Sequence, residues 1–169
     1  MNDVIAWVAQ YGLIVSAVIT IVVWLRLPGP KKWEFALMGL IGGAIALLLL
    51  ELAGKLYYDP RPFVVEHIAP LFQHDADNGF PSDHTLLATF LAACVFFYSR
   101  KWSMVLLAVA LAIGVTRVAA HVHHPIDIVA AMALALASAL IARPVAVRVA
   151  SRLPIGHGRT TGEAGGRSP

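Results

Sequence analysis

The sequence predicts an all-α membrane protein, a polytopic bundle of about five transmembrane helices with one longer loop. Hydrophobic residues make up 59% of the 169 residues and charged residues only 14%, whereas globular chains carry about 25% charge. The mean hydropathy is +0.73, and the apolar residues gather in long runs. A soluble domain of this length has too small an interior to bury so much apolar surface. The composition therefore indicates that the chain resides in a membrane.

Five apolar runs are long enough, or nearly so, to form the helix of roughly 20 residues that crosses a bilayer. In chain order they are residues 4–25, 33–56, 84–99, 103–120 and 126–142. The third is short and needs flanking residues to complete a span. Residues 57–83 form the only long loop, rich in proline, aspartate and aromatic residues. We predict a transmembrane domain over residues 1–150 and a basic, glycine-rich, disordered tail over residues 151–169.

The sequence around each run supports this division. No positive region precedes the first run, as it would in a signal peptide, so we expect a retained helix. Two lysines precede the second run. The third follows Pro-Ser-Asp, in which Ser82 or Asp83 fits a helix N-cap. Arg100 and Lys101 precede the fourth, and the fifth follows Pro125, which a first helical turn tolerates.

The lysines and arginines indicate the orientation, because cations near span ends favour the cytoplasmic side. With five spans, ten of the 13 fall on the side that holds the C-terminus. These ten are Arg26, Lys31, Lys32, Arg100, Lys101, Arg143, Arg148, Arg152, Arg159 and Arg167. The N-terminal side holds only Lys55, Arg61 and Arg117. We predict an N-out, C-in topology, with an anionic ligand compensating these three cations near the outer interface.

Three polar clusters lie on the predicted outer side, and the third runs from Arg117 through His123 to Asp127. If helix covers the last two residues, their side chains share a face. The carboxylate then accepts the Nδ1–H of the imidazole, and Nε2 is free as a nucleophile toward phosphorus. Arg117 can grip phosphate oxygens with its planar guanidinium. The alternative for the pair is a polar turn between helices, with a capping acid.

The second cluster is Pro-Ser-Asp-His at residues 81–84. An N-cap role explains Ser82 or Asp83, but not His84. The free N–H groups of a helix N-terminus attract an anion, and Ser82 adds a hydroxyl donor. His84 would then stand beside a bound phosphate, where an imidazolium can protonate a leaving oxygen.

The first cluster contains Lys55 and Arg61. Arg61 lies between two prolines, which hold the backbone extended. Lys55 is either a phosphate ligand or an interfacial lysine paired with Glu51 one turn earlier. Together the clusters supply what phosphoryl transfer needs: cations for the equatorial oxygens, a nucleophile and an acid for the leaving group.

The order and spacing of the clusters resemble the type 2 phosphatidic acid phosphatase family, whose pattern is K-x6-RP, PSGH and SR-x5-H-x3-D. The resemblance covers roughly residues 33–140 and implies a metal-independent helical-bundle phosphatase without a cofactor. It implies that His123 is the phosphohistidine nucleophile, Asp127 its partner and His84 the general acid. The phosphate ligands that it implies are Ser82, Arg61, Arg117 and Lys55.

Three positions depart from the family pattern. Thr116 replaces the serine of the third motif. Five residues rather than six separate Lys55 from Arg61, which rotates the lysine by about 100° on a helix. Asp83 replaces the glycine of the second motif, and this Pro-Ser-Asp-His form resembles the bacterial undecaprenyl-diphosphate phosphatase branch. We expect Asp83 to line the phosphate site and to favour a protonated His84 by proximity.

Two other classes of function compete with this interpretation. His121, His123, His124, His84 and Asp127 offer ligands suited to zinc, although the two arginines disfavour a second cation there. Buried ionisable residues also mark transporters, but the sequence shows no paired repeats. A non-catalytic lipid-phosphate binder has no need of a histidine–aspartate pair.

The predicted function is hydrolysis of a polyprenyl diphosphate, undecaprenyl diphosphate to undecaprenyl phosphate, on the non-cytoplasmic face of the plasma or inner membrane. Phosphatidic acid or phosphatidylglycerophosphate is the alternative substrate, because apolar helix faces do not distinguish the tails. The expected partner is a membrane lipid phosphate. Nucleic acid is not expected, because the cations form no basic stripe.

Overall fold

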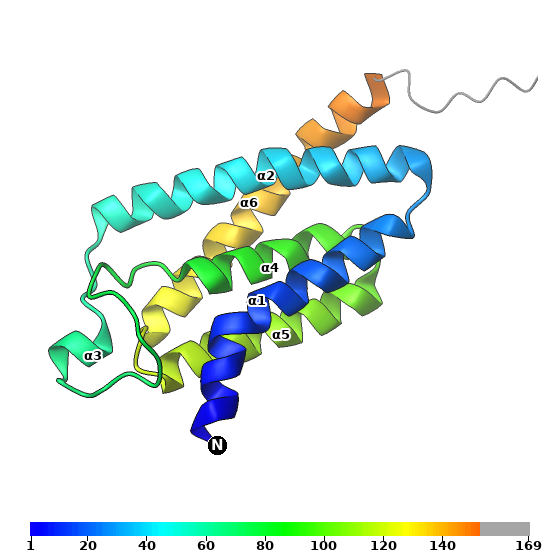
Figure 1. Ribbon diagram of the computed structural model, residues 1–169. Coiled ribbons are helices and arrows are strands. Elements are labelled where there is room, and N and C mark those ends of the chain that lie inside the picture. Colours follow the sequence, from blue (N-terminus) through cyan, green and yellow to red (C-terminus); the bar gives the residue numbers. More distant parts are fainter. Residues whose placement is uncertain (153–169) are drawn as a thin grey trace, which may run out of the picture.

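The computed structural model describes residues 1–152, and the elements it contains over that range are all helices. They are α1 (Asn2–Leu25), α2 (Gly29–Leu56), α3 (Pro62–Val65), α4 (Asp83–Phe96), α5 (Arg100–Ala119) and α6 (Pro125–Arg152). Figure 1 shows α1, α2, α4, α5 and α6 as a bundle, with α3 and the long loop at one end. The predicted all-α fold is confirmed, and the predicted tail, residues 151–169, lies almost entirely outside the described residues.

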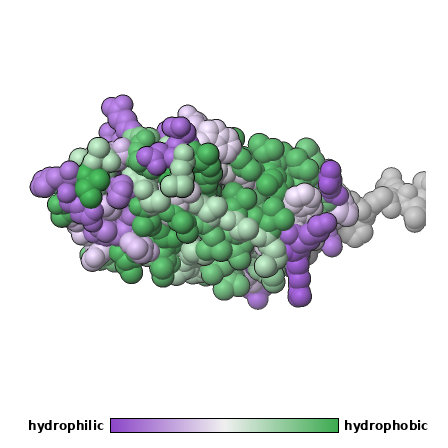
Figure 2. Space-filling model, turned by 90° about the horizontal axis from the view of Figure 1, so that it is seen from below, coloured by the Kyte–Doolittle hydropathy of each residue, from purple (hydrophilic) through white to green (hydrophobic). Residues whose placement is uncertain are grey.

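Four helices, α1, α2, α5 and α6, are long and apolar enough to cross a membrane. The fifth, α4, has 14 residues, which at 1.5 Å per residue cover about 21 Å of a hydrocarbon core about 30 Å thick. The prediction of five spans and their orientation therefore stays a prediction. Figure 2 shows apolar residues around the middle of the bundle and hydrophilic residues at its two ends. Such a band suits a protein whose middle faces lipid.

The short helix α4 is the centre of the bundle. It packs against α1, α2, α5 and α6, and eight of its 14 residues are buried: Thr85, Leu86, Ala88, Thr89, Phe90, Ala92, Cys94 and Val95. Because four helices surround it, α4 is held firmly along its length. Its N-terminus carries the second motif, so the bundle fixes the position of that motif.

Small residues let the helices around α4 approach closely. A methyl group added at Gly12 would lie 2.6 Å from Ile113 on α5, and one at Gly42 would lie 2.7 Å from Phe90 on α4. On α6 the buried face is almost entirely alanine and serine: Ala131, Ala135, Ser138, Ala139, Ala142 and Ala146. Such small residues are typical of helix contacts in membranes, where packing and not hydrophobic burial drives association.

A polar cluster fastens the bundle at the end opposite the long loop. Arg143 on α6 pairs with Glu34 on α2, and the Tyr98 hydroxyl donates to Glu34 at 2.9 Å. The Arg143 guanidinium also lies over the rings of Phe97 and Tyr98. These contacts join α2, α6 and the connection between α4 and α5. They also accommodate the charge of Arg143, which lies one residue past the end of the predicted span.

Candidate functional site

The three motifs meet at the end of the bundle that carries α3 and the long loop (Figure 1). The first lies where α2 ends, the second where α4 begins, and the third in the turn between α5 and α6. In that turn His121 has a positive φ of 60°, which reverses the chain over a few residues. The turn is further fastened because the Phe63 N–H donates to the His121 carbonyl at 3.1 Å.

His123 and Asp127 form a buried pair at the start of α6. Their side chains are 1% and 0% exposed, and His123 Nδ1 lies 3.2 Å from Asp127 Oδ2. The same oxygen accepts the backbone N–H of His124 at 2.9 Å. Asp127 stands in the first turn of α6, where the helix dipole favours a negative charge. The carboxylate is therefore held from two sides and aimed at Nδ1.

The other nitrogen of His123 faces a cation. Nε2 lies 3.3 Å from NH1 of Arg61, and since a guanidinium only donates, Nε2 accepts and Nδ1 carries the hydrogen. Burial lowers the pKa of His123; the bond to Asp127 opposes this, and the charges of Arg117 and Arg61 reinforce it. The imidazole is therefore neutral near pH 7, with a lone pair at Nε2.

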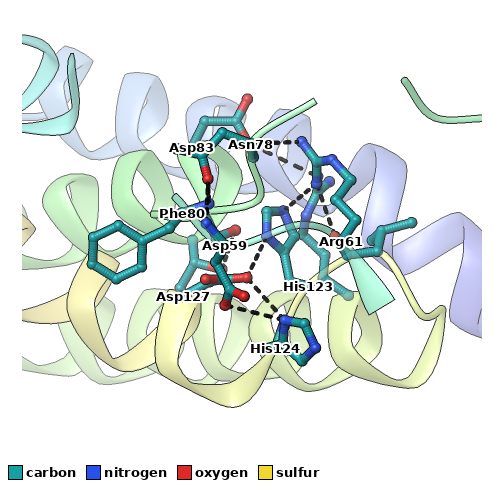
Figure 3. Close-up of polar contacts among 12 residues, drawn as sticks. Asp59, Arg61, Asn78, Phe80, Asp83, His123, His124 and Asp127 are labelled. Atoms are coloured by element: carbon teal, nitrogen blue, oxygen red, sulfur yellow. Dashed lines mark hydrogen bonds and ion pairs between the residues drawn. The ribbon is translucent and has the colours of Figure 1, made fainter. Parts of the chain in front are cut away.

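Arg61 is 5% exposed and reaches the site from the Pro60–Pro62 segment. Its Nε donates to Asp77 Oδ1 at 2.7 Å, and NH1 donates to the Val122 carbonyl at 2.8 Å. An isolated bridge between Pro60 and Asn78 pairs this segment with the end of the long loop. Figure 3 shows the guanidinium beside the ring of His123.

Arg117, in the last turn of α5, is 1% exposed. NH1 donates to the Ala9 carbonyl at 3.2 Å, and NH2 contacts His74 Nε2 at 3.1 Å. NH2 also lies 3.8 Å from Asp83 Oδ1. Burial and the charges of Arg61 and Arg117 lower the pKa of His74. A lower pKa favours the neutral ring, whose Nε2 can accept the hydrogen bond from Arg117. Arg117 Nε is buried without a hydrogen-bond partner among residues 1–152, so the guanidinium retains capacity for an anion.

The second motif departs from the expected capping. Ser82 occupies the N-cap position of α4 but makes no side-chain bond to the helix backbone. Its buried hydroxyl donates instead to Thr85 Oγ1 at 3.1 Å. Asp83 Oδ1 accepts the backbone N–H of His84 at 2.7 Å and lies 2.9 Å from its ring Nδ1. The His84 side chain is 28% exposed, so its ring can meet a ligand from solvent or lipid.

A cavity of about 370 Å³ opens between α2 and these loops. Four of the predicted site residues line it: Lys55, Arg61, Asp83 and His123. Ser82, His84, Arg117 and Asp127 lie outside this lining. Lys55 pairs with Glu51 at 3.0 Å, and both side chains are largely exposed, which confirms the predicted contact one turn apart. The cavity is large enough for a phosphate or diphosphate group.

Asn78 is a structural residue that the sequence analysis missed. Its Oδ1 accepts the backbone N–H groups of Asp59 and Phe80 at 2.9 and 3.0 Å. Its Nδ2 donates to the carbonyls of Gly54 and Tyr57 at 2.8 and 3.0 Å. The side chain thus ties the long loop to the end of α2. The Asn-Gly dipeptide at residues 78–79 is a turn signal that could have drawn attention to it.

The site also contains one group of side chains suited to a metal ion among residues 1–152. Asp59, His124 and Asp127 each offer a ligand atom, and these atoms lie within 4.8 Å of one another. The group differs from the His-x-His-His set considered from the sequence, because Asp59 joins it and His121 and His123 do not. Carboxylates and imidazoles are groups that bind zinc in proteins, so these three side chains are of types suited to a cation.

Comparison with known proteins identifies the family. Residues 31–149 match the PAP2 superfamily. The chain is 30% identical to "bacitracin transport permease protein BcrC" of Bacillus licheniformis, covering 83% of this chain and 69% of that protein. It is 28% identical to "undecaprenyl-diphosphatase BcrC" of Bacillus subtilis, covering 80% and 70%.

Two solved structures share the fold. The crystal structure of Aquifex aeolicus LpxE has a TM-score of 0.69 at 20% identity, covering 83% of this chain and 84% of that one. A PAP2-type phosphatidylglycerolphosphate phosphatase from Bacillus subtilis has a TM-score of 0.64 at 21% identity, covering 88% and 77%. The family match, the relatives and the apolar helices agree: the chain belongs to the PAP2 superfamily and is a multi-pass membrane lipid phosphatase.

Proposed function

We propose that the chain hydrolyses undecaprenyl diphosphate, or a similar polyprenyl diphosphate, to the lipid monophosphate and inorganic phosphate through a phosphohistidine at His123. The observation that carries the mechanism is the buried pair of His123 and Asp127. It holds a neutral imidazole with Nε2 beside Arg61 and the cavity. The substrate follows from the name of the Bacillus subtilis relative, an undecaprenyl-diphosphatase.

In the first step, Nε2 of His123 attacks the terminal phosphorus. A P–N bond forms while the bond to the bridging oxygen breaks, and the lipid monophosphate leaves. His84 gives its proton to the leaving oxygen. Arg61 and Arg117 hold the equatorial oxygens with their planar guanidiniums, since Arg61 lines the cavity and Arg117 Nε has no hydrogen-bond partner among residues 1–152.

In the second step, His84 takes a proton from water, and the water oxygen attacks the phosphorus of the phosphohistidine. The P–N bond breaks, inorganic phosphate leaves, and His123 returns to its neutral form. Ser82 and the N-terminus of α4 contribute donors to the phosphate, and Lys55 contributes charge at the cavity rim. Asp127 keeps the hydrogen on Nδ1 throughout, which stabilises the positive charge that develops on the ring.

The proposal extends to topology and cofactors. Five spans, with the N-terminus outside, place the site on the non-cytoplasmic face of the plasma or inner membrane, because ten of the 13 cations then lie on the other side. Residues 1–150 form the phosphatase domain. The arginines supply the charge that a metal provides in other phosphatases, so the reaction needs no metal.

The test is phosphate release from undecaprenyl diphosphate by protein purified in detergent, with excess EDTA. His123→Asn is compared with wild type and with His67→Asn, a matched change at an exposed histidine of the long loop. Wild type and His67→Asn should release phosphate, and His123→Asn should lose about 10³-fold or more in kcat. Loss of wild-type activity to EDTA, or an active His123→Asn, contradicts the mechanism. Faster release from diacyl phosphates would instead correct the substrate.

A further inference from the structure

The two oxygens of Asp127 differ in their contacts. Oδ2 accepts from His123 and from the backbone of His124. Oδ1 is buried and has no hydrogen-bond partner among residues 1–152. An unsatisfied buried polar atom costs about 1–3 kcal/mol, and more when it is charged. Something should therefore satisfy Oδ1, and the neighbouring side chains indicate what it is.

Asp59 lies next to Asp127 and is held there by its own backbone. Its N–H donates to Asn78 Oδ1 at 2.9 Å, and its carbonyl accepts the N–H of Gly79 at 2.8 Å. The Asp59 side chain is 13% exposed, and Oδ2 lies 3.1 Å from Nδ1 of His124. In Figure 3 the side chains of Asp59, Asp127 and His124 lie close together. The backbone contacts fix the main chain at Asp59, and the carboxyl group lies near both His124 and Asp127.

An oxygen of Asp59 lies within 4.8 Å of an oxygen of Asp127, and at that separation each negative charge disfavours ionisation of the other carboxyl unless a proton or a cation lies between them. Burial raises the pKa of Asp59, the Asp127 carboxylate raises it further, and His124 opposes these effects. A protonated Asp59 supplies the O–H donor that Asp127 Oδ1 lacks. A metal ion would add positive charge beside Arg61, which already faces His123 at 3.3 Å. The charges of the site thus favour a proton over a metal.

We propose that Asp59 is a positioning residue, which shares a proton with Asp127 and thereby fixes the carboxylate that orients His123. The inference rests on the proposed histidine mechanism. It extends the pair to a third group, Asp59, whose Oδ2 lies 3.1 Å from Nδ1 of His124. Asp59 and His124 stand at variable positions of the family pattern, within K-x6-RP and H-x3-D. Their role therefore comes from the contacts and not from the motifs.

The experiment compares Asp59→Asn and Asp59→Ala with wild type in the purified, full-length protein. An asparagine amide donates to Asp127 without needing a proton, whereas alanine leaves Oδ1 unpaired. Asp59→Asn should keep kcat within about threefold. Asp59→Ala should lose about 10- to 100-fold in kcat, with KM little changed, as for other residues that orient a reacting group through a second one. Asp75→Ala, at an exposed aspartate of the same loop, is the matched control and should match wild type.

The pH profile separates positioning from a merely structural role. The groups that face His123 are Arg61, Arg117, Asp127 and His74, and all remain in these variants. Without a donor from residue 59, the charge of Asp127 acts on the imidazole more strongly. The acid limb of kcat/KM should therefore move to higher pH in Asp59→Ala and stay in place in Asp59→Asn. Unfolding temperatures in detergent check that each variant folds. If Asp59→Ala does not fold, Asp59→Val replaces it, because valine also lacks a hydrogen-bond donor.

The outcomes distinguish this inference from the proposed mechanism. If rapid quenching traps no phosphohistidine in wild type, the mechanism itself fails. If wild type forms phosphohistidine and Asp59→Ala forms it at the same rate, the positioning role alone is wrong. An Asp59→Asn variant as slow as Asp59→Ala also overturns it. Wild-type activity that falls with EDTA and returns with Mg²⁺ would place a cation where the proton is proposed.

Discussion

Replacing Asp127 with asparagine tests whether the carboxylate orients His123. The substitution keeps the size of the side chain but removes its charge. In the wild type, Oδ2 accepts from His123 Nδ1 at 3.2 Å and from the His124 N–H at 2.9 Å. In the variant, either the oxygen or the nitrogen of the asparagine amide occupies that position. If the amide nitrogen turns toward Nδ1, it donates there, and the imidazole hydrogen moves to Nε2. The nucleophilic lone pair is then lost.

The expected magnitude follows from these contacts. A hydrogen bond to a charged group contributes about 1.5–3 kcal/mol, and each 1.4 kcal/mol is tenfold in rate. Loss of that bond alone slows the reaction by about 10- to 150-fold. The wrong tautomer adds to this, and the corresponding change in a Ser-His-Asp triad costs about 10⁴-fold. We expect kcat of Asp127→Asn to fall by about 10³- to 10⁴-fold.

The assay is phosphate release at saturating undecaprenyl diphosphate, with KM measured in parallel. KM should change little, because Arg61 and Arg117 still hold the phosphate. Thermal unfolding in detergent shows whether the variant folds. A folded Asp127→Asn variant with kcat within tenfold of wild type would refute the reasoning, since the carboxylate would then have no part in orienting the nucleophile.

Three further predictions follow from the geometry of the site. Because burial holds the pKa of His123 below its usual 6.5, kcat/KM should fall with acid only below that pH, and an acid limb centred above pH 6.5 would contradict this. Gly79→Ala puts a methyl group 3.2 Å from Asp127 Oδ2 and should lower kcat about tenfold. Gly39→Ala is the control, because nothing lies within 4 Å of the added methyl group, and its kcat should not change. Equal kcat values for the two variants would refute the prediction that crowding at Asp127 slows the reaction. Lys55→Gln should raise KM, but by less than about tenfold, because the exposed charge of Lys55 is screened by solvent. An unchanged KM would mean that Lys55 does not bind the phosphate and only contacts Glu51.

The helices and the family could be predicted from the sequence because their signals are local. Long apolar runs mark helices wherever they pack, and the three motifs recur in a fixed order and spacing. The prediction was less accurate at helix ends. It ended the last span at residue 142, before Arg143, whereas α6 continues to Arg152. Arg143 is accommodated by its pairing with Glu34 and stacking on Phe97, which hydropathy does not reveal.

The surroundings of the nucleophile could not be predicted, because they depend on contacts between residues far apart in the chain. His74 meets Arg117 across 43 residues, and Asp77 meets Arg61 across 16. Neither belongs to a motif, and the long loop that carries them has no apolar periodicity to fix its path. Ser82 shows the converse, since a good N-cap residue at the N-cap position bonds to Thr85 Oγ1 instead. The N-cap preference of serine correctly predicted the position of Ser82, but tertiary packing determined which group its hydroxyl contacts.

The central claim is that His123 carries the phosphoryl group during turnover. It is tested most directly by quenching the enzyme after mixing with undecaprenyl diphosphate labelled in the terminal phosphate, and by mapping the label by mass spectrometry. The account predicts an acid-labile, alkali-stable phosphohistidine at residue 123, formed fast enough to account for turnover and present in excess EDTA. Turnover without any covalent phosphoenzyme, or with the label on another residue, would contradict it.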